Sequence, residues 1–415
     1  MKNLVLLEEI IIDQLKRIKR KEKLILRDID YKKYKNNKQI VVISGIRRCG
    51  KSSLMKQFMS KYESFYYINF DDERLINFDV ENFNDLMLIY KKRFKAKVIF
   101  IDEVQNIPAW ERFVRRIYDE GYKVYVTGSN AKLLSSELAT HLTGRYFKIE
   151  LYPFSFKERL VFEQIDTKNI GTDERALIMK NFDEYLRLGG FPEFVKTKND
   201  EYLKMIYNDI LYKDLLTRFN IREVKSFKQL INFLYANVSK DISYNSLKNI
   251  LNFKSATSIK NYIAFSEEAY LLFELYKYDF SLKKQYLSDK KIYVIDNGLR
   301  NVVAFYFSND NGKLLENLVF LHLKRLGKEI FFYKEKKECD FIVKEKNKIT
   351  SVFQVAYTLN HDNRKRELNG LLMAVKKFKL KKGIILTYNQ EEEFVLNGIK
   401  IIVMPTWKWL LASFK

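Results

Sequence analysis

The sequence predicts an α/β protein with a parallel β-sheet in its N-terminal half. Apolar runs at residues 39–45, 97–103 and 123–130 each end in small or acidic residues. Short apolar runs bounded by turn-forming residues are typical of strands that are buried on both faces. A segment with helical spacing at residues 52–60 lies between the first two runs. This order favours parallel strands with helices packed against the sheet.

The composition is that of a globular protein with a large excess of positive charge. The 415 residues, 47% hydrophobic and 31% charged, are enough for several domains of about 100–200 residues each. Lysine and arginine exceed aspartate and glutamate by 75 − 52 = 23. A field of this sign favours anionic partners, namely nucleic acid, nucleotide phosphates or an acidic membrane surface. DNA is the predicted partner, and the alternative is a lysine bias spread over the surface.

The cysteine content and the hydropathy predict a cytoplasmic protein. Cys49 and Cys339 are too few and too far apart for a disulfide framework or a zinc site. No run approaches the ~20 apolar residues that span a bilayer, so no membrane partner is expected. Two glutamates precede any apolar core near the N-terminus, which is not the pattern of a signal peptide. Residues 5–29 predict an amphipathic helix with a basic side.

The first apolar run leads into a loop that matches the phosphate-binding pattern GxxxxGK[ST]. The loop is Gly45–Ser52, and a helix follows it. Backbone N–H groups of such a loop, together with the positive end of the helix, surround phosphate oxygens. Lys51 is expected to reach the β- and γ-phosphates of ATP, and the Ser52 hydroxyl to bind Mg²⁺. The predicted nucleotide-binding residues are Gly45, Ile46, Arg47, Arg48, Cys49, Gly50, Lys51, Ser52 and Ser53.

The second and third apolar runs end in the residue types that hydrolysis of a bound nucleotide requires. Asp102 is expected to hold Mg²⁺ together with Ser52, and Glu103 to orient and deprotonate the attacking water. The third run ends in Thr127-Gly-Ser-Asn130, where ligands bind in open α/β sheets. Ser129 or Asn130 is expected to touch the γ-phosphate or the water. The catalytic prediction is therefore Lys51, Asp102, Glu103 and Asn130, in a P-loop NTPase.

An ordered set of motifs resembles the bacterial and archaeal AAA-like ATPases that carry a C-terminal domain related to restriction-endonuclease folds. The likeness covers nearly the whole chain. Its motifs are Gly45–Ser52, Ile68-Asn-Phe-Asp-Asp72, Ile101-Asp-Glu-Val-Gln105, Thr127-Gly-Ser-Asn130, Leu142-Thr-Gly-Arg145, Leu151-Tyr-Pro-Phe-Ser-Phe156, Gly189-Gly-Phe-Pro-Glu193 and Tyr212-Lys-Asp214.

The resemblance implies roles that spacing alone does not assign. Asn69 matches the polar residue that restrains the catalytic glutamate in such ATPases. Ser129 and Asn130 match the position that senses the γ-phosphate. Arg145 matches the arginine finger, which usually reaches the nucleotide of a neighbouring subunit, so the resemblance implies a homo-oligomer. The alternatives are that Arg145 acts within its own subunit or pairs with a local acid.

The predicted domains are an AAA-like core at 1–150, a helical lid at 151–225, a winged-helix module at 226–290 and a restriction-endonuclease-like α/β domain at 291–415. In the third, Ser255 is expected to cap a recognition helix, and strands are expected at 271–278 and 283–287. The alternative for this module is contact between domains or subunits. Its expected outward residues are Lys254, Thr257, Lys260 and Asn261, with Lys283 and Lys284 on the wing.

The last domain has an α/β order with two carboxylates but lacks the lysine of a nuclease site. Glu316 and Asp340 match metal-binding positions, whereas Gln354-Val-Ala356 stands where Glu-x-Lys is expected. The alternative is that Arg364, Lys365 or Arg366 of the next helix supplies the missing positive charge. The predicted function is an ATPase that couples nucleotide state to DNA or partner binding by its C-terminal half. The alternatives are an ATP-gated, Mg²⁺-dependent nuclease and a slow-turnover signalling or defence switch.

Overall fold

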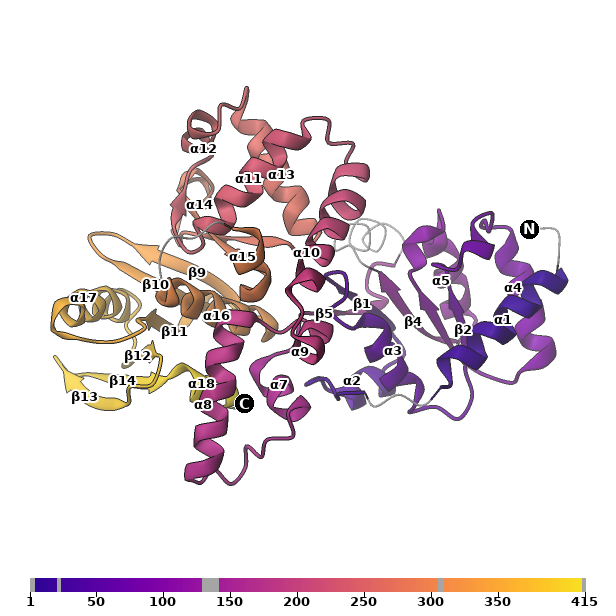
Figure 1. Ribbon diagram of the computed structural model, residues 1–415, viewed down its shortest axis with the longest axis horizontal. Helices are drawn as coiled ribbons and strands as arrows, with labels where there is room; N and C mark the ends of the chain where they lie inside the picture. The colour runs from indigo at the N-terminus through magenta and orange to yellow at the C-terminus, as the bar shows by residue number, and fades with distance from the viewer. Residues whose placement is uncertain (1–3, 21–23, 129–141, 305–309, 413–415) are drawn as a thin grey trace. The chain divides into compact units, whose positions relative to one another are not determined.

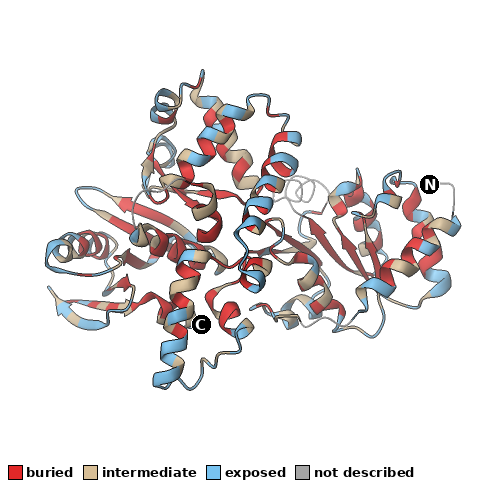
Figure 2. Cartoon of the chain, in the orientation of Figure 1, coloured by how far each residue is buried: buried red, intermediate tan, exposed pale blue. Residues whose placement is uncertain are grey.

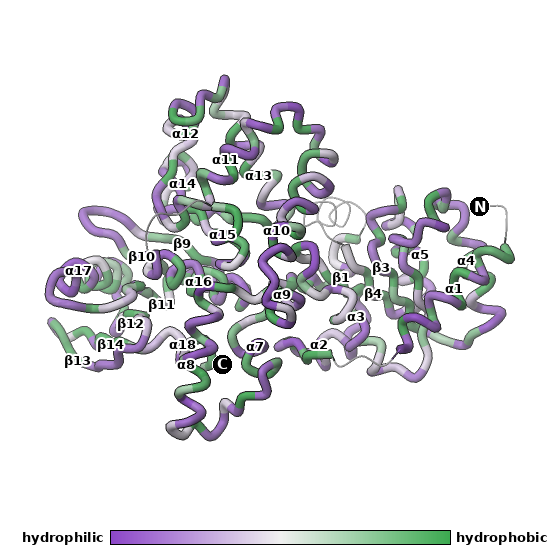
Figure 3. The backbone as a smooth tube through the Cα atoms, viewed as in Figure 1, coloured by the Kyte–Doolittle hydropathy of each residue, from purple (hydrophilic) through white to green (hydrophobic). Residues whose placement is uncertain are grey.

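The computed structural model describes residues 4–20, 24–128, 142–304 and 310–412 (Figure 1). The chain divides into two compact units, Met1–Tyr152 and Pro153–Lys415. Hydrophobic and hydrophilic stretches alternate along both units (Figure 3), as expected of elements that bury one face. Within the described ranges, no helix is long and apolar enough to cross a membrane.

The first unit contains a five-stranded sheet in the order β2-β3-β4-β1-β5. Every neighbouring pair is parallel, which confirms the predicted parallel sheet. The interior strands are buried on both faces (Figure 2), since helices cover them. The strands are β1 (Ile40–Gly45), β2 (Tyr66–Asn69), β3 (Val98–Asp102), β4 (Lys123–Gly128) and β5 (Tyr146–Leu151). The helices are α1 (Leu4–Ile18), α2 (Tyr31–Asn36), α3 (Lys51–Met59), α4 (Asn82–Arg93) and α5 (Trp110–Asp119).

The predicted helix over residues 5–29 is wrong in its second half. Helix α1 ends at Ile18, and residues 24–30 are not helical. Asp30 accepts a hydrogen bond from the backbone N–H of Lys33 and caps a separate helix, α2. The intervening backbone is bonded instead to Gln57 of α3, which donates to the carbonyl of Ile25 at 2.6 Å. These tertiary bonds replace the helical ones that the periodicity predicted.

Helix α1 closes one edge of this sheet through a side chain. The amide of Gln14 accepts from Asn69 N at 2.8 Å and donates to Asn69 O at 3.0 Å. Gln14 therefore satisfies the backbone of edge strand β2 as a neighbouring strand would.

The second unit begins with helices in the region predicted as a lid. They are α7 (Phe156–Phe162), α8 (Thr172–Leu188), α9 (Pro192–Thr197), α10 (Asp200–Asp209) and α11 (Val224–Ala236), with a π-helix at Ile210–Thr217. Helix α8 ends at Gly189, whose φ is +73°. A Cβ there would lie 2.1 Å from Oδ1 of Asp296, and Oδ2 of Asp296 accepts from Gly190 N at 2.7 Å. Only glycine allows this close approach of the Asp296 carboxylate to the turn.

A small antiparallel sheet in the order β6-β8-β7 follows the helices. Its elements are β6 (Asp241–Ile242), α12 (Tyr244–Ile250), α13 (Ala256–Glu268), β7 (Leu272–Tyr276), α14 (Leu282–Leu287), β8 (Lys290–Val294) and α15 (Asn297–Val303). The strand predicted at 283–287 is wrong, because these residues form α14, capped by the Ser281 side chain. Strand β7 pairs with β8 instead. Lys283 and Lys284, predicted on the wing, lie on helix α14.

The C-terminal part of the second unit is a mixed six-stranded sheet in the order β13-β14-β12-β11-β10-β9. Strands β11, β12 and β14 are parallel, and β9, β10 and β13 are antiparallel to their neighbours. The helix and strands predicted from residue 314 onward are present, and β13 was not predicted. The elements are α16 (Asn311–Arg325), β9 (Glu329–Lys334), β10 (Glu338–Glu345), β11 (Lys348–Val355), α17 (His361–Lys377), β12 (Lys382–Thr387), β13 (Glu392–Leu396), β14 (Ile399–Pro405) and α18 (Thr406–Leu411).

Candidate nucleotide-binding site

Of the predicted site residues, the Gly45–Ser52 loop, Asp102 and Glu103 lie at the carboxyl edge of the first sheet. Strand β1 ends at Gly45, and the neighbouring strands β4 and β3 end at Gly128 and Asp102. Ligands of open α/β sheets bind at this edge. A Cβ on Gly45 would lie 2.1 Å from the carbonyl oxygen of Leu151, so the loop leaves β1 under the end of β5 and requires glycine.

The Gly45–Ser52 loop is closed around the ammonium of Lys51. Lys51 is buried, and its Nζ donates to the carbonyls of Gly45 at 3.1 Å and Ile46 at 3.3 Å. Gly50 has φ +99° and precedes helix α3, whose first turn is aimed at the loop. The ammonium therefore lies inside the loop where phosphate oxygens are expected, bonded only to carbonyls that a phosphate outcompetes as an acceptor.

Arg27 supports this loop and was not found by sequence reasoning. Its guanidinium is buried and donates to the carbonyl of Cys49 at 2.9 Å and of Tyr152 at 2.6 Å. The backbone N–H of Arg27 donates to Gln57 of α3. Arg27 thereby links the phosphate-binding loop to the end of β5, and no motif marks a residue in this role.

The structure brings together the two residues predicted to hold Mg²⁺. Burial raises the pKa of the Asp102 carboxyl, and hydrogen bonds from Thr127 and Ser52 lower it. Asp102 is 2% exposed and receives the Thr127 hydroxyl on Oδ1. A hydroxyl and a buried carboxylate beside a phosphate-binding loop form the hard oxygen donor set that Mg²⁺ prefers. The residues present therefore fit the ion.

Glu103 stands directly beyond Asp102 in a backbone conformation that is uncommon for a glutamate. Its φ is +51°, and its backbone N–H donates to Oγ1 of Thr127 at 3.0 Å. Its carboxylate accepts a hydrogen bond from Nε2 of Gln105 at 2.5 Å. The other amide atom, Oε1 of Gln105, is buried and has no hydrogen-bond partner among the described residues. Strained backbone of this kind is concentrated at functional sites.

Asn69 does not make the contact with Glu103 that the resemblance implied. It pairs with Asp102 across strands β2 and β3, and its Oδ1 accepts from the backbone N–H of Asp71 at 2.9 Å. In the structure, Gln105 makes the side-chain contact with Glu103 instead.

Arg145 lies at the opposite edge of the sheet from the phosphate-binding loop. Its carbonyl oxygen accepts a hydrogen bond from the N–H of Ile40, the first residue of β1. The phosphate-binding loop begins at Gly45, the last residue of the same strand. Six residues of strand at about 3.3 Å each separate the two edges by roughly 20 Å. Its guanidinium lies 3.8 Å from Asp119, a local acid. Ser129 and Asn130 fall outside the described residues.

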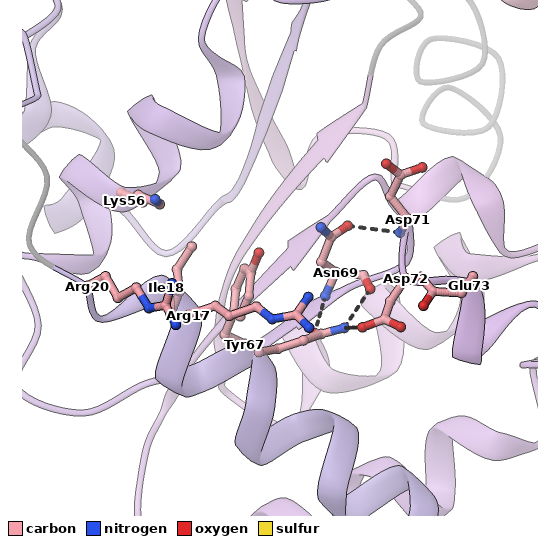
Figure 4. Close-up of a pocket in the computed structure, with 10 residues that line it drawn as sticks. Arg17, Ile18, Arg20, Lys56, Tyr67, Asn69, Asp71, Asp72 and Glu73 are labelled. Atoms are coloured by element: carbon pink, nitrogen blue, oxygen red, sulfur yellow. Dashed lines mark hydrogen bonds between the residues drawn. The ribbon is translucent and has the colours of Figure 1, made fainter.

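A polar pocket of about 400 Å³ lies at the end of β2 (Figure 4). Gln14 spans it, donating to Asn69 O and to Oδ2 of Asp72. Because Asn69 pairs with Asp102, this pocket opens at the same sheet edge as the nucleotide site. Its other lining residues are Arg17, Ile18, Arg20, Lys56, Tyr67, Asp71 and Glu73.

The predicted DNA-contacting helix is present in the second unit as α13. Ser255 caps it, accepting from the backbone N–H of Thr257 at 3.0 Å as predicted. The expected outward residues are all exposed: Lys254, Thr257, Lys260 and Asn261.

The carboxylates predicted in the C-terminal domain surround a lysine that sequence reasoning missed. Glu316 and Asp340 lie 3.3 and 3.5 Å from Nζ of Lys291, which comes from strand β8. Two of the three substitutes considered for the absent lysine are engaged elsewhere, Arg364 with Glu392 and Arg366 with Glu367. In the part of the chain that the structure describes, no group of three acidic, histidine or cysteine side chains could hold a metal ion.

Comparisons with known families divide the chain into three matched regions. Residues 37–160 match an AAA domain, residues 179–310 match a domain of unknown function (DUF8612), and residues 311–409 match another (DUF4143). The first match contains β1, β3, β4 and the phosphate-binding loop, so this region is a P-loop domain of the AAA type.

Two relatives match almost over their whole length. An uncharacterized protein of Methanocaldococcus jannaschii is 39% identical over 430 residues, covering 98% of this chain and 96% of the relative. An uncharacterized protein of Haemophilus influenzae is 32% identical over 394 residues, covering 90% and 95%. Among solved structures, a Walker-type ATPase of Pyrococcus abyssi aligns with a TM-score of 0.45 and 15% identity over 68% of this chain and 97% of that chain.

Proposed function

The chain belongs to the same family as the M. jannaschii and H. influenzae proteins, and we propose that it is an ATPase whose nucleotide state controls binding of DNA by its C-terminal half. The observation that carries the ATPase part is the contact between Ser52 and Asp102, with Glu103 as the next residue. Through this contact, the phosphate-binding loop, the candidate Mg²⁺ ligands and the candidate base lie together at one edge of the sheet.

The residues of this edge divide the work of phosphoryl transfer to water. Backbone N–H groups of the loop and the Lys51 ammonium bind the phosphates, for which Lys51 exchanges its carbonyl partners for phosphate oxygens. Ser52 and Asp102 would hold Mg²⁺, which would supply positive charge beside the phosphates. Glu103 accepts the proton of the attacking water, once its carboxylate leaves Gln105.

Arg145 is proposed to act on the nucleotide of a neighbouring subunit. Its position roughly 20 Å from the loop of its own subunit exceeds the reach of an arginine side chain. The ion pair with Asp119 is partly exposed, with side-chain exposures of 36% and 53%, and such pairs are weak enough to exchange. The proposal therefore includes a homo-oligomer with shared ATPase sites.

Two features support DNA as the partner of the C-terminal half. The net charge of +23 favours a polyanion, and α13 presents exposed basic and polar side chains from a capped N-terminus. A polyanion bound there would be held chiefly through its phosphates.

A slow-turnover switch is the second candidate, favoured by the hydrogen bond from Gln105 to Glu103. The amide of Gln105 occupies a carboxylate oxygen of Glu103 that an attacking water would otherwise contact. The nuclease alternative has no such support, because Lys291 occupies the centre of its carboxylates.

The test is steady-state ATP hydrolysis with and without double-stranded DNA, using Glu103→Gln as the blank. The proposal expects turnover above the blank that DNA stimulates, with a stimulation that falls as salt is added. Turnover that DNA does not change would move the assignment to the nucleotide-controlled switch. Activity equal to the blank under all conditions would refute the ATPase.

A further inference from the structure

The exposed face of helix α5 in the first unit carries three arginines, Arg112, Arg115 and Arg116. They line a shallow pocket of about 440 Å³ together with Asp119 and Glu120. Arg115 lies 3.9 Å from Asp119 and Arg116 lies 3.9 Å from Glu120, which is near the limit of an ion pair. Arg112 makes no ion pair with any residue that the structure describes. Exposed pairs of this length are weak, so the guanidinium groups remain available to other carboxylates.

Arg145 belongs to the same surface. Its Nε lies 3.8 Å from Oδ1 of Asp119, and Nε of Arg115 lies 3.9 Å from Oδ2 of the same carboxylate. A partner that receives Arg145 therefore comes close to α5 as well. The four arginines outnumber the two acids between them, so this arginine surface has an excess of positive charge. We define it as Arg112, Arg115, Arg116 and Arg145.

Residues 71–85, from the end of strand β2 to the first turn of α4, form an acidic segment in a chain whose net charge is +23. The segment contains six carboxylates and one base, Arg74, which is already paired with two acids. Asp71, Glu73 and Glu81 are exposed and make no ion pair within the described ranges. Ile76 of the same segment is 83% exposed. The acidic segment thus presents unpaired negative charge together with an apolar side chain.

The two surfaces reach opposite edges of the sheet. Asn69, the last residue of β2, pairs with Asp102, and its Oδ1 accepts from the N–H of Asp71 at 2.9 Å. The acidic segment therefore begins at the carboxyl edge, about one strand spacing of 4.8 Å from the strand that ends in Asp102. The arginine surface reaches the amino edge, where Arg145 lies and where α5 leads into β4. Roughly 20 Å of strand separates the two edges, so Arg145 and the acidic segment do not pair within one copy.

The spacing on the two surfaces agrees when one copy is placed head to tail on another. Arg115 is joined to Arg145 through a single carboxylate, that of Asp119. On a neighbour, the acidic segment starts one strand away from Asp102. One placement can therefore bring Arg145 to the neighbour's nucleotide site and the arginines of α5 to its acidic segment. Arginine pairs with carboxylates in bidentate geometry, and its aliphatic stem covers apolar groups such as Ile76.

We propose that the arginine surface of one copy docks on the acidic segment of a second copy of this chain, and that this contact positions Arg145 at the neighbour's nucleotide site. The proposal rests on the proposed function, because it names the surfaces that build the shared site inferred for Arg145. The contact joins two different surfaces, so each copy keeps one of them available for a further copy. Opposite charge at the contact makes the assembly sensitive to salt.

The test reverses each set of charges in the full chain and then mixes the variants. Arg115→Glu/Arg116→Glu places carboxylates against the acidic segment, and Asp71→Lys/Glu73→Lys places lysines against the arginine surface. Each variant alone is expected to weaken self-association by at least about tenfold, because like charges face each other. An equimolar mixture is expected to regain association, since every contact in an alternating assembly then joins opposite charges. Association is measured by sedimentation velocity over a series of protein and salt concentrations.

The control is Lys346→Glu/Lys348→Glu, which changes the net charge as the arginine reversal does, at an exposed hairpin tip of the second unit. It is expected to associate as the unmodified chain does. Circular dichroism checks that each variant is folded, and Arg115→Gln/Arg116→Gln, which removes charge without reversing it, is also expected to associate more weakly. An unmodified chain that stays a monomer, arginine variants that associate normally, an equal loss in the control, or a mixture of folded variants without recovery would each overturn the proposal.

Failure of this interface is distinguishable from failure of the ATPase. Self-association is measured without hydrolysis, and none of the reversed residues lies in the phosphate-binding loop or among the candidate Mg²⁺ ligands. Association that follows the charge reversals without any ATP turnover would refute the ATPase and keep the interface. Turnover at the full rate by a chain that remains a monomer would refute the interface and keep the ATPase.

Discussion

The side-chain amide of Gln105 donates a hydrogen bond to the carboxylate of Glu103, with 2.5 Å between Nε2 and Oε2. The two residues are separated by one position, and the left-handed backbone of Glu103 turns its side chain toward this amide. The amide thus occupies a carboxylate oxygen that would otherwise be free to contact a water molecule. In the proposed ATPase, Gln105 is therefore a positioning residue for Glu103.

Replacing Gln105 by leucine is expected to raise basal ATP turnover severalfold and to reduce the further stimulation by DNA. The substitution keeps the bulk of the side chain and removes the donor, so Glu103 is free to accept a proton from water. Basal and stimulated rates of Gln105→Leu are compared with those of Glu103→Gln. A fall of Gln105→Leu to the level of Glu103→Gln would show instead that the amide orients the base for catalysis.

Lys51→Ala and Glu103→Gln are expected to separate binding from turnover. Lys51→Ala removes a charge-assisted bond to phosphate, worth about 1.5–3 kcal/mol, so ATP affinity falls at least tenfold. Glu103→Gln leaves the phosphate contacts in place, so affinity stays near normal while hydrolysis is lost. Both are measured by titration with a fluorescent ATP analogue and by phosphate release. Equal loss of affinity in the two variants would contradict the assignment of Glu103 as the base.

Arg145→Ala is expected to lower turnover on the order of 10³-fold while ATP affinity stays near normal. The decisive measurement mixes Arg145→Ala with Lys51→Ala, each inactive alone. Because Arg145 lies roughly 20 Å from its own loop, an intact Arg145 on a Lys51→Ala subunit is expected to serve an intact loop on an Arg145→Ala subunit. Partial recovery of activity on mixing supports a shared site, and the absence of recovery despite mixed assembly removes it.

Lys291→Met is expected to destabilise the second unit by about 3–5 kcal/mol, because it leaves the carboxylates of Glu316 and Glu338 around a neutral side chain. The measurement is the urea midpoint of the transition that reports the second unit, followed by tryptophan fluorescence, since two of the three tryptophans, Trp407 and Trp409, lie there. Adding Glu316→Gln to Lys291→Met removes one of the uncompensated charges and is expected to restore part of the loss. No recovery in the double variant would mean that Glu316 does not need the ammonium.

The stability of the second unit is expected to fall between about pH 4 and pH 8 through Asp340. Burial and the charge of Glu316 raise the pKa of Asp340 to about 8, against the lowering effect of Lys291. Between the unfolded and folded pKa values the folded state holds a proton that the unfolded state has lost, so raising the pH favours unfolding. Urea midpoints of Asp340→Asn relative to the unmodified chain are expected to rise with pH over this range. A difference that is independent of pH would show that Asp340 is ionised throughout.

The sequence predicted the parts of the nucleotide site in which a buried apolar strand ends directly in a site residue. The strand before Gly45 and the strand before Asp102 are continuous apolar runs, and parallel pairing brings their ends to one edge without further information. Sequence reasoning could not predict the contacts of Gln105, Arg27 and Lys291. Each contacts residues that come close to it only in the folded chain. Lys291 lies 49 positions from Asp340 in the chain, and no spacing rule joins them.

The wrong predictions have local causes as well. Residues 283–287 were predicted as a strand, but the Ser281 hydroxyl caps a helix there, a signal that is present in the sequence. Residues 24–29 continue the helical spacing of α1, but the side chains of Gln57 and Arg27 bind the backbone of that segment and of the loop beside it. In this second case, long-range hydrogen bonds of polar side chains outweigh the helical spacing of the sequence.

The carboxylate of Asp296, which lies between strand β8 and helix α15, contacts the turn that follows helix α8. It caps α15 by accepting from Leu299 N, and it receives Gly190 N from the turn after α8. A fragment that ends near residue 225 would keep both glycines of that turn and lose the acid that fits against them. We therefore expect the two segments to unfold in a single transition and to be retained together in relatives. A recombination event that separated them would destabilise both.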